Sequence, residues 1–412
     1  MLKISSNLKD VITKTRKQGL YEKAGEFYDL ANVTAEKGSL TYFREVISTQ
    51  DRVTTIYDKR TRSTKDMLMF GSNNYLNLAN HPLVFETIER DVRKYGTGIG
   101  GPPILNGYTK LHRQLEDKLS EIKQCESTLL YSSGYSANLA IPVTLHSKGD
   151  VFLYDELSHA SLIDGLNKTT GPKRQFKHNS PEDLQHKIDN LTMDYKDLFV
   201  GVEGIYSMDG DSAPLSGFVE VAKKNNAILI LDDAHGLGTA GKTGKGTAEM
   251  YDVEGDIDIT LGTFSKSLAM SGGFISSTKE IINYFRYFSR PFLFSASMPI
   301  VNVSGVLAGL QIIESEPERM AKLKENVKYA HELLSHFDVV TPPEAGILSI
   351  RIPEETNIRE LNGKIHDHGI FLNTIEYPAV PVEEQRIRIS FMTNHTRQDI
   401  DYLAGVLEKL IG

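Results

Sequence analysis

The feature that most limits the fold of this chain is a series of short, mainly apolar runs separated by helical stretches. The runs are Thr128–Tyr131, Val151–Tyr154, Leu198–Val202, Ala227–Leu231 and Ile257–Leu261. Strands that are apolar along their whole length are buried on both faces, as in the parallel sheets of α/β proteins. The pattern therefore predicts an α/β fold built around a mainly parallel sheet.

The chain is long enough for more than one domain, since its 412 residues exceed what one ordinary core holds. Residues 1–60 predict an N-terminal helical arm, and residues 61–299, with their alternating strands and helices, predict a large domain. Residues 300–412 predict a smaller C-terminal α+β domain, because a long helical region, broken near Pro317, precedes three strand-like segments. These segments are Asp338–Thr341, Ile347–Ile352 and Arg386–Phe391.

Two helix starts carry local signals. Ser180 offers an N-cap hydroxyl and Pro181 stands at the first helical position, with acidic residues in the first turn. Ser216 similarly precedes a helix predicted over residues 217–224, which runs directly into the strand Ala227–Leu231. Both patterns predict a helix that packs beside the sheet.

Charge and composition argue against several classes of function. A formal net charge of -8 argues against a nucleic-acid binder, which needs a basic face. Cys125 is the single cysteine, so neither an intrachain disulfide nor a cysteine metal cluster can form, and we assign no metal site. One cysteine and a charged N-terminus without a secretory pattern favour the cytoplasm. The most apolar helical stretch, Ile300–Ile313, is too short and too polar to span a bilayer.

Residues suited to chemistry follow the predicted strands, where ligands of parallel sheets bind. Asp232 and His235 follow Ala227–Leu231, and Lys266 follows Ile257–Leu261 within GTFSKSL. Taken singly, Asp232 and His235 could as well be a helix-capping acid and a surface histidine. Lys266 taken singly could be an exposed loop lysine. A lysine among small residues can be desolvated, which makes its amine a nucleophile. An acid for a pyridinium nitrogen and a lysine for a Schiff base together are what pyridoxal phosphate requires.

Two further strand ends complete the set. After Thr128–Tyr131 the segment SSGYSAN opens a helix with small residues, which leaves backbone N–H groups able to bind a phosphate. After Val151–Tyr154 the segment DELSHAS contains His159, whose imidazole could stack on a flat ring. A lone histidine is more often structural, but His159 falls at the right place in this series.

The motifs SSGYSAN, DELSHASLIDG, EGIYSMDGD, DDAHGLG and GTFSKSLA occur in this order, and the chain resembles the α-oxoamine synthases, a family of pyridoxal-phosphate enzymes of fold type I. The resemblance extends from about Met69 to the C-terminal RIRISFMTNHT. Within the family, GTFSKSLA, FSASM and the final HT look most like bacterial serine palmitoyltransferases. The resemblance implies a large domain with a mainly parallel seven-stranded sheet that binds the cofactor, and a homodimer.

The resemblance also implies a role for each matching residue. Lys266 would form the Schiff base, Asp232 would hold a proton on the ring nitrogen, and His159 would stack on the ring. The other matches would contact the ring oxygen (His235, Ser207), the phosphate (Gly134, Tyr135, Thr263), the phosphate of a neighbouring subunit (Ser295) and the amino-acid carboxylate (Asn73, Arg388). Arginine suits the last task because its planar fork pairs two oxygens.

The implied reaction is a decarboxylative Claisen-type condensation of an amino acid, with serine favoured, and an acyl thioester of CoA or a carrier protein. Its product would be an α-amino ketone such as 3-ketodihydrosphingosine, an early compound of sphingolipid biosynthesis. One departure concerns the substrate: Gly101-Pro102-Pro103 stands where the family usually carries an arginine, so we expect altered handling of the acyl donor.

Three alternatives stay open. The first is a sister enzyme of the family that uses glycine, alanine or cysteate. The second is a non-catalytic partner subunit, against which the joint presence of Lys266, Asp232 and His159 argues. The third is a nicotinamide-dependent oxidoreductase, suggested by the glycine run from Gly96 to Gly101; that run follows a helix-like stretch rather than a strand, which weakens the match.

Overall fold

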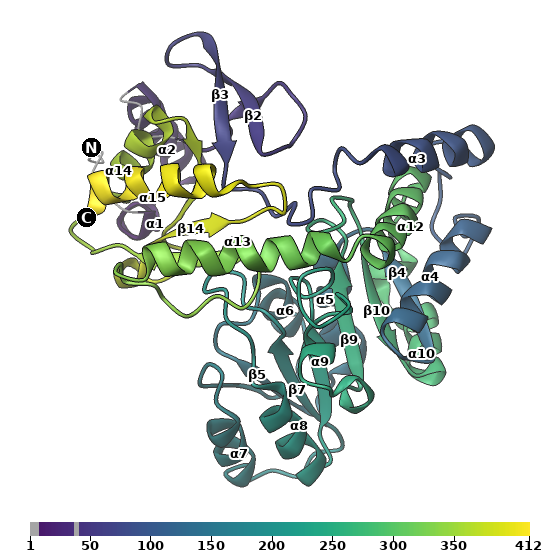
Figure 1. Ribbon diagram of the computed structural model, residues 1–412. Helices are drawn as coiled ribbons and strands as arrows, with labels where there is room; N and C mark the ends of the chain where they lie inside the picture. Colours follow the sequence, from purple (N-terminus) through teal and green to yellow (C-terminus); the bar gives the residue numbers. More distant parts are fainter. Residues whose placement is uncertain (1–7, 37–40) are drawn as a thin grey trace. The chain divides into compact units, whose positions relative to one another are not determined.

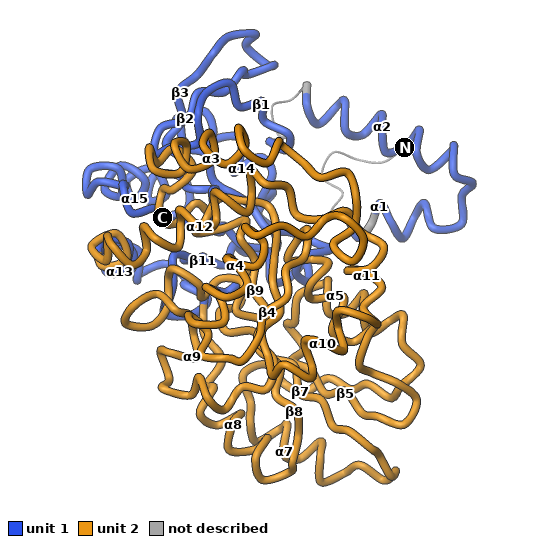
Figure 2. Tube along the Cα trace, turned by 90° about the vertical axis from the view of Figure 1, so that its right-hand side faces the viewer, with its two compact units in different colours: residues 1–73, 208–210, 322–412 blue, residues 74–207, 211–321 orange. Residues whose placement is uncertain are grey.

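The computed structural model describes residues 8–36 and 41–412. The chain forms two compact units (Figure 2): unit 1 comprises residues 1–73, 208–210 and 322–412, and unit 2 comprises residues 74–207 and 211–321. By sequence we placed divisions at 60/61 and 299/300. The contacts group the chain differently because strand β3 (Ser63–Met69) pairs with β12 (Ile370–Phe371), near the C-terminus. Likewise, helix α12 (Ile300–Ser315) packs in unit 2 against α3 (Pro82–Tyr95).

Unit 2 contains a seven-stranded sheet with the order β4-β10-β9-β8-β7-β5-β6 (Figure 1). Its strands are β4 (Ser127–Tyr131), β5 (Val151–Asp155), β6 (Lys173–Phe176), β7 (Leu198–Glu203), β8 (Ile228–Asp232), β9 (Ile259–Thr263) and β10 (Gly273–Ser277). Strands β9, β8, β7, β5 and β6 run parallel, while β10 is antiparallel to both its neighbours. The prediction of a mainly parallel seven-stranded sheet is confirmed, although β6 and β10 were not foreseen as strands.

Both faces of this sheet are buried, as the apolar runs predicted. Along β7, Leu198, Val200 and Val202 belong to the hydrophobic core on one face, whereas Phe199 belongs to the core on the other. The helices of unit 2 besides α3 and α12 are α4 (Lys110–Ile122), α5 (Gly134–Leu145), α6 (Ala160–Leu166), α7 (Pro181–Asp189), α8 (Leu215–Lys224), α9 (Thr247–Met250), α10 (Lys279–Phe288) and α11 (Arg290–Leu293). Side chains of α7 and α8 join the first core, and those of α5, α6 and α10 join the second.

Unit 1 contains two small sheets. One has the order β1-β2-β3-β12 and the other β11-β14-β13. Their remaining strands are β1 (Glu45–Val46), β2 (Val53–Asp58), β11 (Ile347–Arg351), β13 (Asn373–Ile375) and β14 (Arg386–Ser390), and the helices are α1 (Leu8–Thr15), α2 (Leu20–Glu36), α14 (Ile358–Asp367) and α15 (Arg397–Ile411). Helix α13 (Glu318–Leu334) begins in unit 2 and ends in unit 1. Residues 1–60, where a helical arm was expected, also contain strands β1 and β2, which pair with each other.

Several local predictions can be compared directly with the structure. Helix α7 begins after Ser180, whose hydroxyl accepts the Asp183 N–H, as predicted. Ser216 was wrongly placed before its helix: α8 begins at Leu215 because the Pro214 carbonyl already accepts helical hydrogen bonds. Residues 338–341 contribute an isolated bridge from Val339 to Ile350 instead of a strand. Within the described ranges, no helix combines the length and apolar character needed to cross a membrane.

Candidate active site

A pocket of about 300 Å³ lies in unit 2 at the carboxyl edge of the seven-stranded sheet. It is lined by Ser133, Gly134, Tyr135, Asn138, His159, Ser161, Glu203, Ser207, Asp232, Ala234, His235, Leu261, Thr263, Ser265, Lys266, Ser271 and Gly272. These residues come from the segments that follow β4, β5, β7, β8 and β9, and from the start of β10. Parallel strands bring their carboxyl ends to one edge, so residues more than 130 positions apart meet there.

One end of the pocket is formed by the start of helix α5. Ser133 caps this helix by accepting the Ser136 N–H, and the first N–H groups of a helix have no acceptor within it. Gly134 packs so closely on β9 that a Cβ at this position would lie 2.6 Å from Thr263 Cβ and 2.7 Å from Thr263 Oγ1. The absent side chain therefore leaves backbone N–H groups and hydroxyls beside one another, which suits a phosphate.

Asp232 ends β8 and carries a carboxylate that is only partly compensated. Its Oδ2 accepts the Asn138 amide at 2.7 Å and its Oδ1 accepts the Ala234 N–H at 3.1 Å. Burial raises the pKa of Asp232 above its ordinary value, although nearby Lys266 and His159 oppose the rise. A cationic ring nitrogen in the pocket would supply the missing positive charge.

The adjacent Asp233 shows what a fully compensated carboxylate looks like. Its side chain is completely buried, forms an ion pair with Lys123 at 2.7 Å and accepts the Thr247 hydroxyl at 2.7 Å. Because Lys123 is itself buried, this pair holds the turn after β8 in place. Of the two neighbouring acids, only Asp232 lines the pocket.

His159 and His235, both predicted from the sequence, are held in place by different hydrogen bonds. His159 caps helix α6, with its Nδ1 2.7 Å from the Ser161 hydroxyl and accepting the Ser161 N–H. Burial lowers the pKa of His159, which favours the neutral imidazole. His235 has its Nδ1 2.9 Å from the Tyr75 hydroxyl. Both rings are thereby fixed in orientation before any ligand binds.

The pocket brings together eight of the residues singled out from the sequence: Gly134, Tyr135, His159, Ser207, Asp232, His235, Thr263 and Lys266. Ser295 lies instead beside Ser132, with the two hydroxyl oxygens 3.1 Å apart. Asn73 and Arg388 meet in unit 1, where both terminal nitrogens of Arg388 donate to Asn73 Oδ1, at 3.2 and 3.1 Å. Their assignment to substrate remains a prediction.

Asn138 and Glu203 are among the polar residues of the pocket that received no role from the sequence. Asn138, on the second turn of α5, donates to Asp232, and Glu203, the last residue of β7, is buried beside it. Glu203 carried a usable signal, because it is an acid at the end of an apolar strand and opens the quoted motif EGIYSMDGD. The Asn138 contact spans 94 positions and had no local signal.

The chemistry of this lining fits pyridoxal phosphate. The start of α5 with the Thr263 hydroxyl suits the phosphate, the carboxylate of Asp232 suits a protonated ring nitrogen, and the Lys266 amine suits the aldehyde. The close approach of Gly134 to Thr263 provides a cradle that a Cβ would fill. The same lining offers no geometric support for the nicotinamide alternative, whose glycine run, from Gly96, follows helix α3 rather than a strand.

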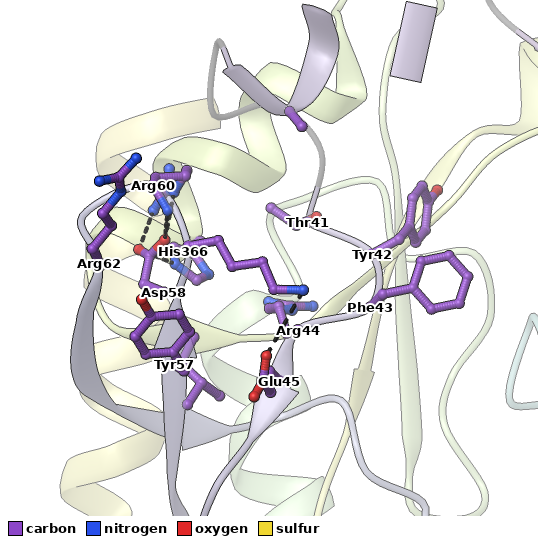
Figure 3. Close-up of a pocket in the computed structure, with 13 residues that line it drawn as sticks. Thr41, Tyr42, Phe43, Arg44, Glu45, Tyr57, Asp58, Arg60, Arg62 and His366 are labelled. Atoms are coloured by element: carbon purple, nitrogen blue, oxygen red, sulfur yellow. Dashed lines mark hydrogen bonds and ion pairs between the residues drawn. The ribbon is translucent and has the colours of Figure 1, made fainter. Parts of the chain in front are cut away.

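A second cavity, of about 580 Å³, lies in unit 1 beside β2 (Figure 3). Asp58 lines this cavity and forms an ion pair with Arg60 at 2.9 Å, while His366 Nε2 approaches the same carboxylate at 3.1 Å. Arg44 covers the face of Phe371, 3.4 Å from the ring centroid. The Asp58 carboxylate is thus matched by groups of the chain itself.

The chain is similar in sequence to several named enzymes. Residues 65–407 match the family described as aminotransferase class I and II. A serine palmitoyltransferase of Sphingobacterium spiritivorum is 38% identical over 386 residues, which cover 93% of this chain and 94% of that protein. An 8-amino-7-oxononanoate synthase of Thermoanaerobacter pseudethanolicus is 35% identical over 347 residues, which cover 84% of this chain and 88% of that protein.

Solved structures agree with the sequence matches. A serine palmitoyltransferase from S. paucimobilis, determined with a bound PLP–myriocin aldimine, superposes with a TM-score of 0.88 and 29% identity, and the match covers 95% of this chain and 98% of that one. The fold is therefore that of the pyridoxal-phosphate transferases of fold type I, as predicted.

Proposed function

Because the chain belongs to the α-oxoamine synthase family of pyridoxal-phosphate-dependent enzymes, we propose that it condenses serine with a long-chain acyl thioester and releases carbon dioxide. The product would be 3-ketodihydrosphingosine when palmitoyl-CoA is the donor. A new bond would join the α-carbon of the amino acid to the acyl carbonyl carbon, the thiol and carbon dioxide would leave, and a proton would return to the α-carbon.

The observation that carries this proposal is that Lys266, Asp232 and His159 line one pocket whose polar groups suit pyridoxal phosphate. Serine is favoured over other amino acids because a serine palmitoyltransferase matches nearly the whole chain at 38% identity. The same completeness of the pocket argues against a non-catalytic partner subunit, in which the lysine and the ring-facing acid would not both be needed.

Each residue would perform a defined task. Pyridoxal phosphate, when bound, supplies an electron sink for negative charge at the α-carbon. Lys266 would hold the cofactor and then remove the α-proton with its Nζ. Asp232 would keep a proton on the ring nitrogen, and the neutral ring of His159 would cover one face of the cofactor. Arg388, with Asn73 hydrogen-bonded to it, would bind the substrate carboxylate through two parallel hydrogen bonds.

The loop around Gly101 would influence the acyl donor. The Gly101 carbonyl accepts both the N–H and the hydroxyl of Ser297, at 3.1 Å each, and the Pro102 carbonyl accepts the Gly107 N–H. Proline fixes φ and removes a backbone donor, so Pro102 and Pro103 form a stiff wall with few donors. The loss of the family's arginine there would weaken contact with a polar or anionic part of the donor.

A sister reaction is the second candidate. Relatives named 8-amino-7-oxononanoate synthase reach 35% identity, so another amino acid, such as glycine, alanine or cysteate, would fit the same machinery. A homodimer that acts in the cytoplasm is part of the proposal. Phe294, beside the predicted partner-facing Ser295, supports it because its ring is 76% exposed, as at an uncovered interface. Light scattering of the active enzyme would test the dimer.

The function is tested with purified holoenzyme and a panel of serine, glycine, alanine and cysteate. Each amino acid is added alone while the visible absorbance of the cofactor is followed, and then with palmitoyl-CoA while products are identified by mass spectrometry. We expect serine to change the spectrum and to give 3-ketodihydrosphingosine. A product from glycine, alanine or cysteate alone would reassign the substrate, and a protein that binds no pyridoxal phosphate would overturn the proposal.

A further inference from the structure

Three neighbouring strands of the unit 2 sheet end in acidic residues. Asp155 ends β5, Glu203 ends β7 and Asp232 ends β8, and Glu203 pairs directly with Asp232 in the strand register. Asp155 and Glu203 are withdrawn from solvent, with exposed fractions of 0% and 5%, and Asp232 is half-buried. Three negative charges at adjacent strand ends would repel one another strongly without compensation.

Two of these acids are compensated by donors. Asp155 accepts the backbone N–H groups of Leu157 and Asn179, at 2.9 and 2.8 Å, and forms an ion pair with His178 at 3.0 Å. Asp232 accepts Asn138 and Ala234 and lies in the electrostatic field of Lys266. Both acids therefore have partners that favour the ionised form.

Glu203 differs from both of its neighbours. Its Oε1 accepts the backbone N–H of His159, and no other described group is hydrogen-bonded to its carboxyl. Around it stand two acids, Asp232 and Asp155, one cation, Lys266, and the neutral His159. The Tyr206 hydroxyl, 3.3 Å from the Glu203 N–H, is also uncharged, because burial raises its pKa.

Burial and the neighbouring Asp232 both raise the pKa of Glu203 well above its ordinary range. The geometry explains the direction, since one ammonium group faces two carboxyls and Asp232 has the better set of donors. A buried carboxyl with one hydrogen-bond donor and a neighbouring acid is more stable with its proton than without it.

We propose that Glu203 is a protonated positioning residue of the cofactor site, which holds the backbone of His159 through its carboxyl oxygen and leaves Asp232 as the single anion that faces the cofactor ring. The proposal rests on the roles proposed for His159 and Asp232, and it does not depend on which amino acid is the substrate. A second ionised carboxyl would compete with Asp232 for the positive charge of the bound ring. A neutral acid keeps the anchor for His159 without that competition.

The test compares Glu203→Gln with Glu203→Ala in the holoenzyme. Glutamine has the shape of a protonated glutamate and an oxygen that accepts the His159 N–H, so we expect cofactor affinity and turnover to stay within about threefold of wild type. Alanine removes the anchor, and we expect cofactor affinity to fall by about tenfold or more, since a buried donor is left unpaired. The pH titration of the cofactor's visible absorbance should be the same in wild type and Glu203→Gln.

The matched control is Asp155→Asn, the same acid-to-amide change on the neighbouring strand. It should destabilise the protein because His178 loses an ionised partner. Infrared spectra of wild-type holoenzyme should contain the band of a protonated carboxyl, and Glu203→Gln should remove it. A titration shifted by about one pH unit or more in Glu203→Gln, or the absence of that band, would show an ionised Glu203 and overturn the proposal. Neither readout requires substrate, so failure here is distinguishable from failure of the proposed reaction.

Discussion

The cavity of unit 1 and the cofactor pocket of unit 2 both contain buried carboxylates, and the two regions treat the charge in opposite ways. In unit 1 burial alone would raise the pKa of Asp58, but hydrogen bonds from Arg60 and His366 outweigh it, and the pKa lies well below its ordinary value (Figure 3). In unit 2 burial prevails, and the pKa values of Asp232 and Glu203 are raised.

This difference in pKa separates carboxylates that stabilise the fold from carboxyls that belong to a functional site. A carboxylate matched by an arginine within the chain is satisfied before any ligand binds, so it contributes to stability. Carboxyls whose pKa is raised in a pocket are not fully matched by cations of the chain, and such groups cluster at functional sites. We therefore expect substitutions in the unit 2 pocket to affect activity first, and those in the unit 1 cavity to affect stability first.

The largest effect should come from Lys266→Ala. We expect turnover to fall by on the order of 10³-fold or more, since proton transfer by a positioned group alone contributes about 10²–10⁴-fold. Borohydride reduction of wild type should attach the pyridoxyl group to the peptide that contains Lys266. The exposed Lys242 of the same unit serves as control, and Lys242→Ala should leave turnover unchanged. A label on any other lysine would contradict the assignment.

Asp232→Asn should retain the fold and lose about 10²-fold in kcat, because an amide cannot balance a protonated ring nitrogen by charge. Its neighbour provides a matched control. Asp233→Asn leaves Lys123 buried without its anion, so it should lower the free energy of unfolding by about 3 kcal/mol. Urea denaturation measures the effect on stability and steady-state kinetics the effect on kcat. If the two variants changed stability and kcat to the same extent, the separate roles of Asp232 and Asp233 would be contradicted.

His178, outside the pocket, extends the comparison within unit 2. Burial would lower the pKa of its imidazole, but ion pairs with Asp155 and Asp211 raise it to about 10. Stability from this group is fully present below the unfolded pKa of about 6.5 and is lost as pH rises through 10. His178→Gln should lower the free energy of unfolding by about 2 kcal/mol at pH 7. The variant should also lack the loss of stability at alkaline pH. Urea denaturation at neutral and alkaline pH would measure both effects. A wild-type alkaline loss that persists in the variant would assign it to another group.

The smallest effect should come from Asp58→Asn in unit 1. We expect the free energy of unfolding at pH 7 to fall by about 1–2 kcal/mol, a modest value because the Arg60 side chain is 26% exposed. The depressed pKa of Asp58 means that its contribution is present above the unfolded pKa of about 3.9 and is lost as pH falls below it. The variant should therefore show a shallower acid dependence than wild type, with an unchanged cofactor absorbance. A loss of bound cofactor would contradict the separation of the two regions.

The sequence by itself determined five of the seven strands of the sheet and eight of the residues that line its pocket. Continuous apolar runs identify strands buried on both faces, and parallel strands must present their carboxyl ends at one edge. For this reason Lys266, Asp232 and His159 could be assigned to one pocket although they lie far apart in the chain. Helix caps such as Ser180 are also encoded by a few neighbouring residues and can be predicted from them.

Only the tertiary structure decided which partner each polar group has. Strand β10 begins at a glycine pair and pairs with two strands distant in sequence, so nothing local indicated it. Asp232 and Asp233 are adjacent acids whose tasks differ because Asn138 meets one and Lys123 meets the other, across 94 and 110 positions. The protonation of Glu203 likewise depends on how many donors surround it. Apolar periodicity is encoded along the chain, whereas charge compensation arises between segments, and only folding brings those segments together.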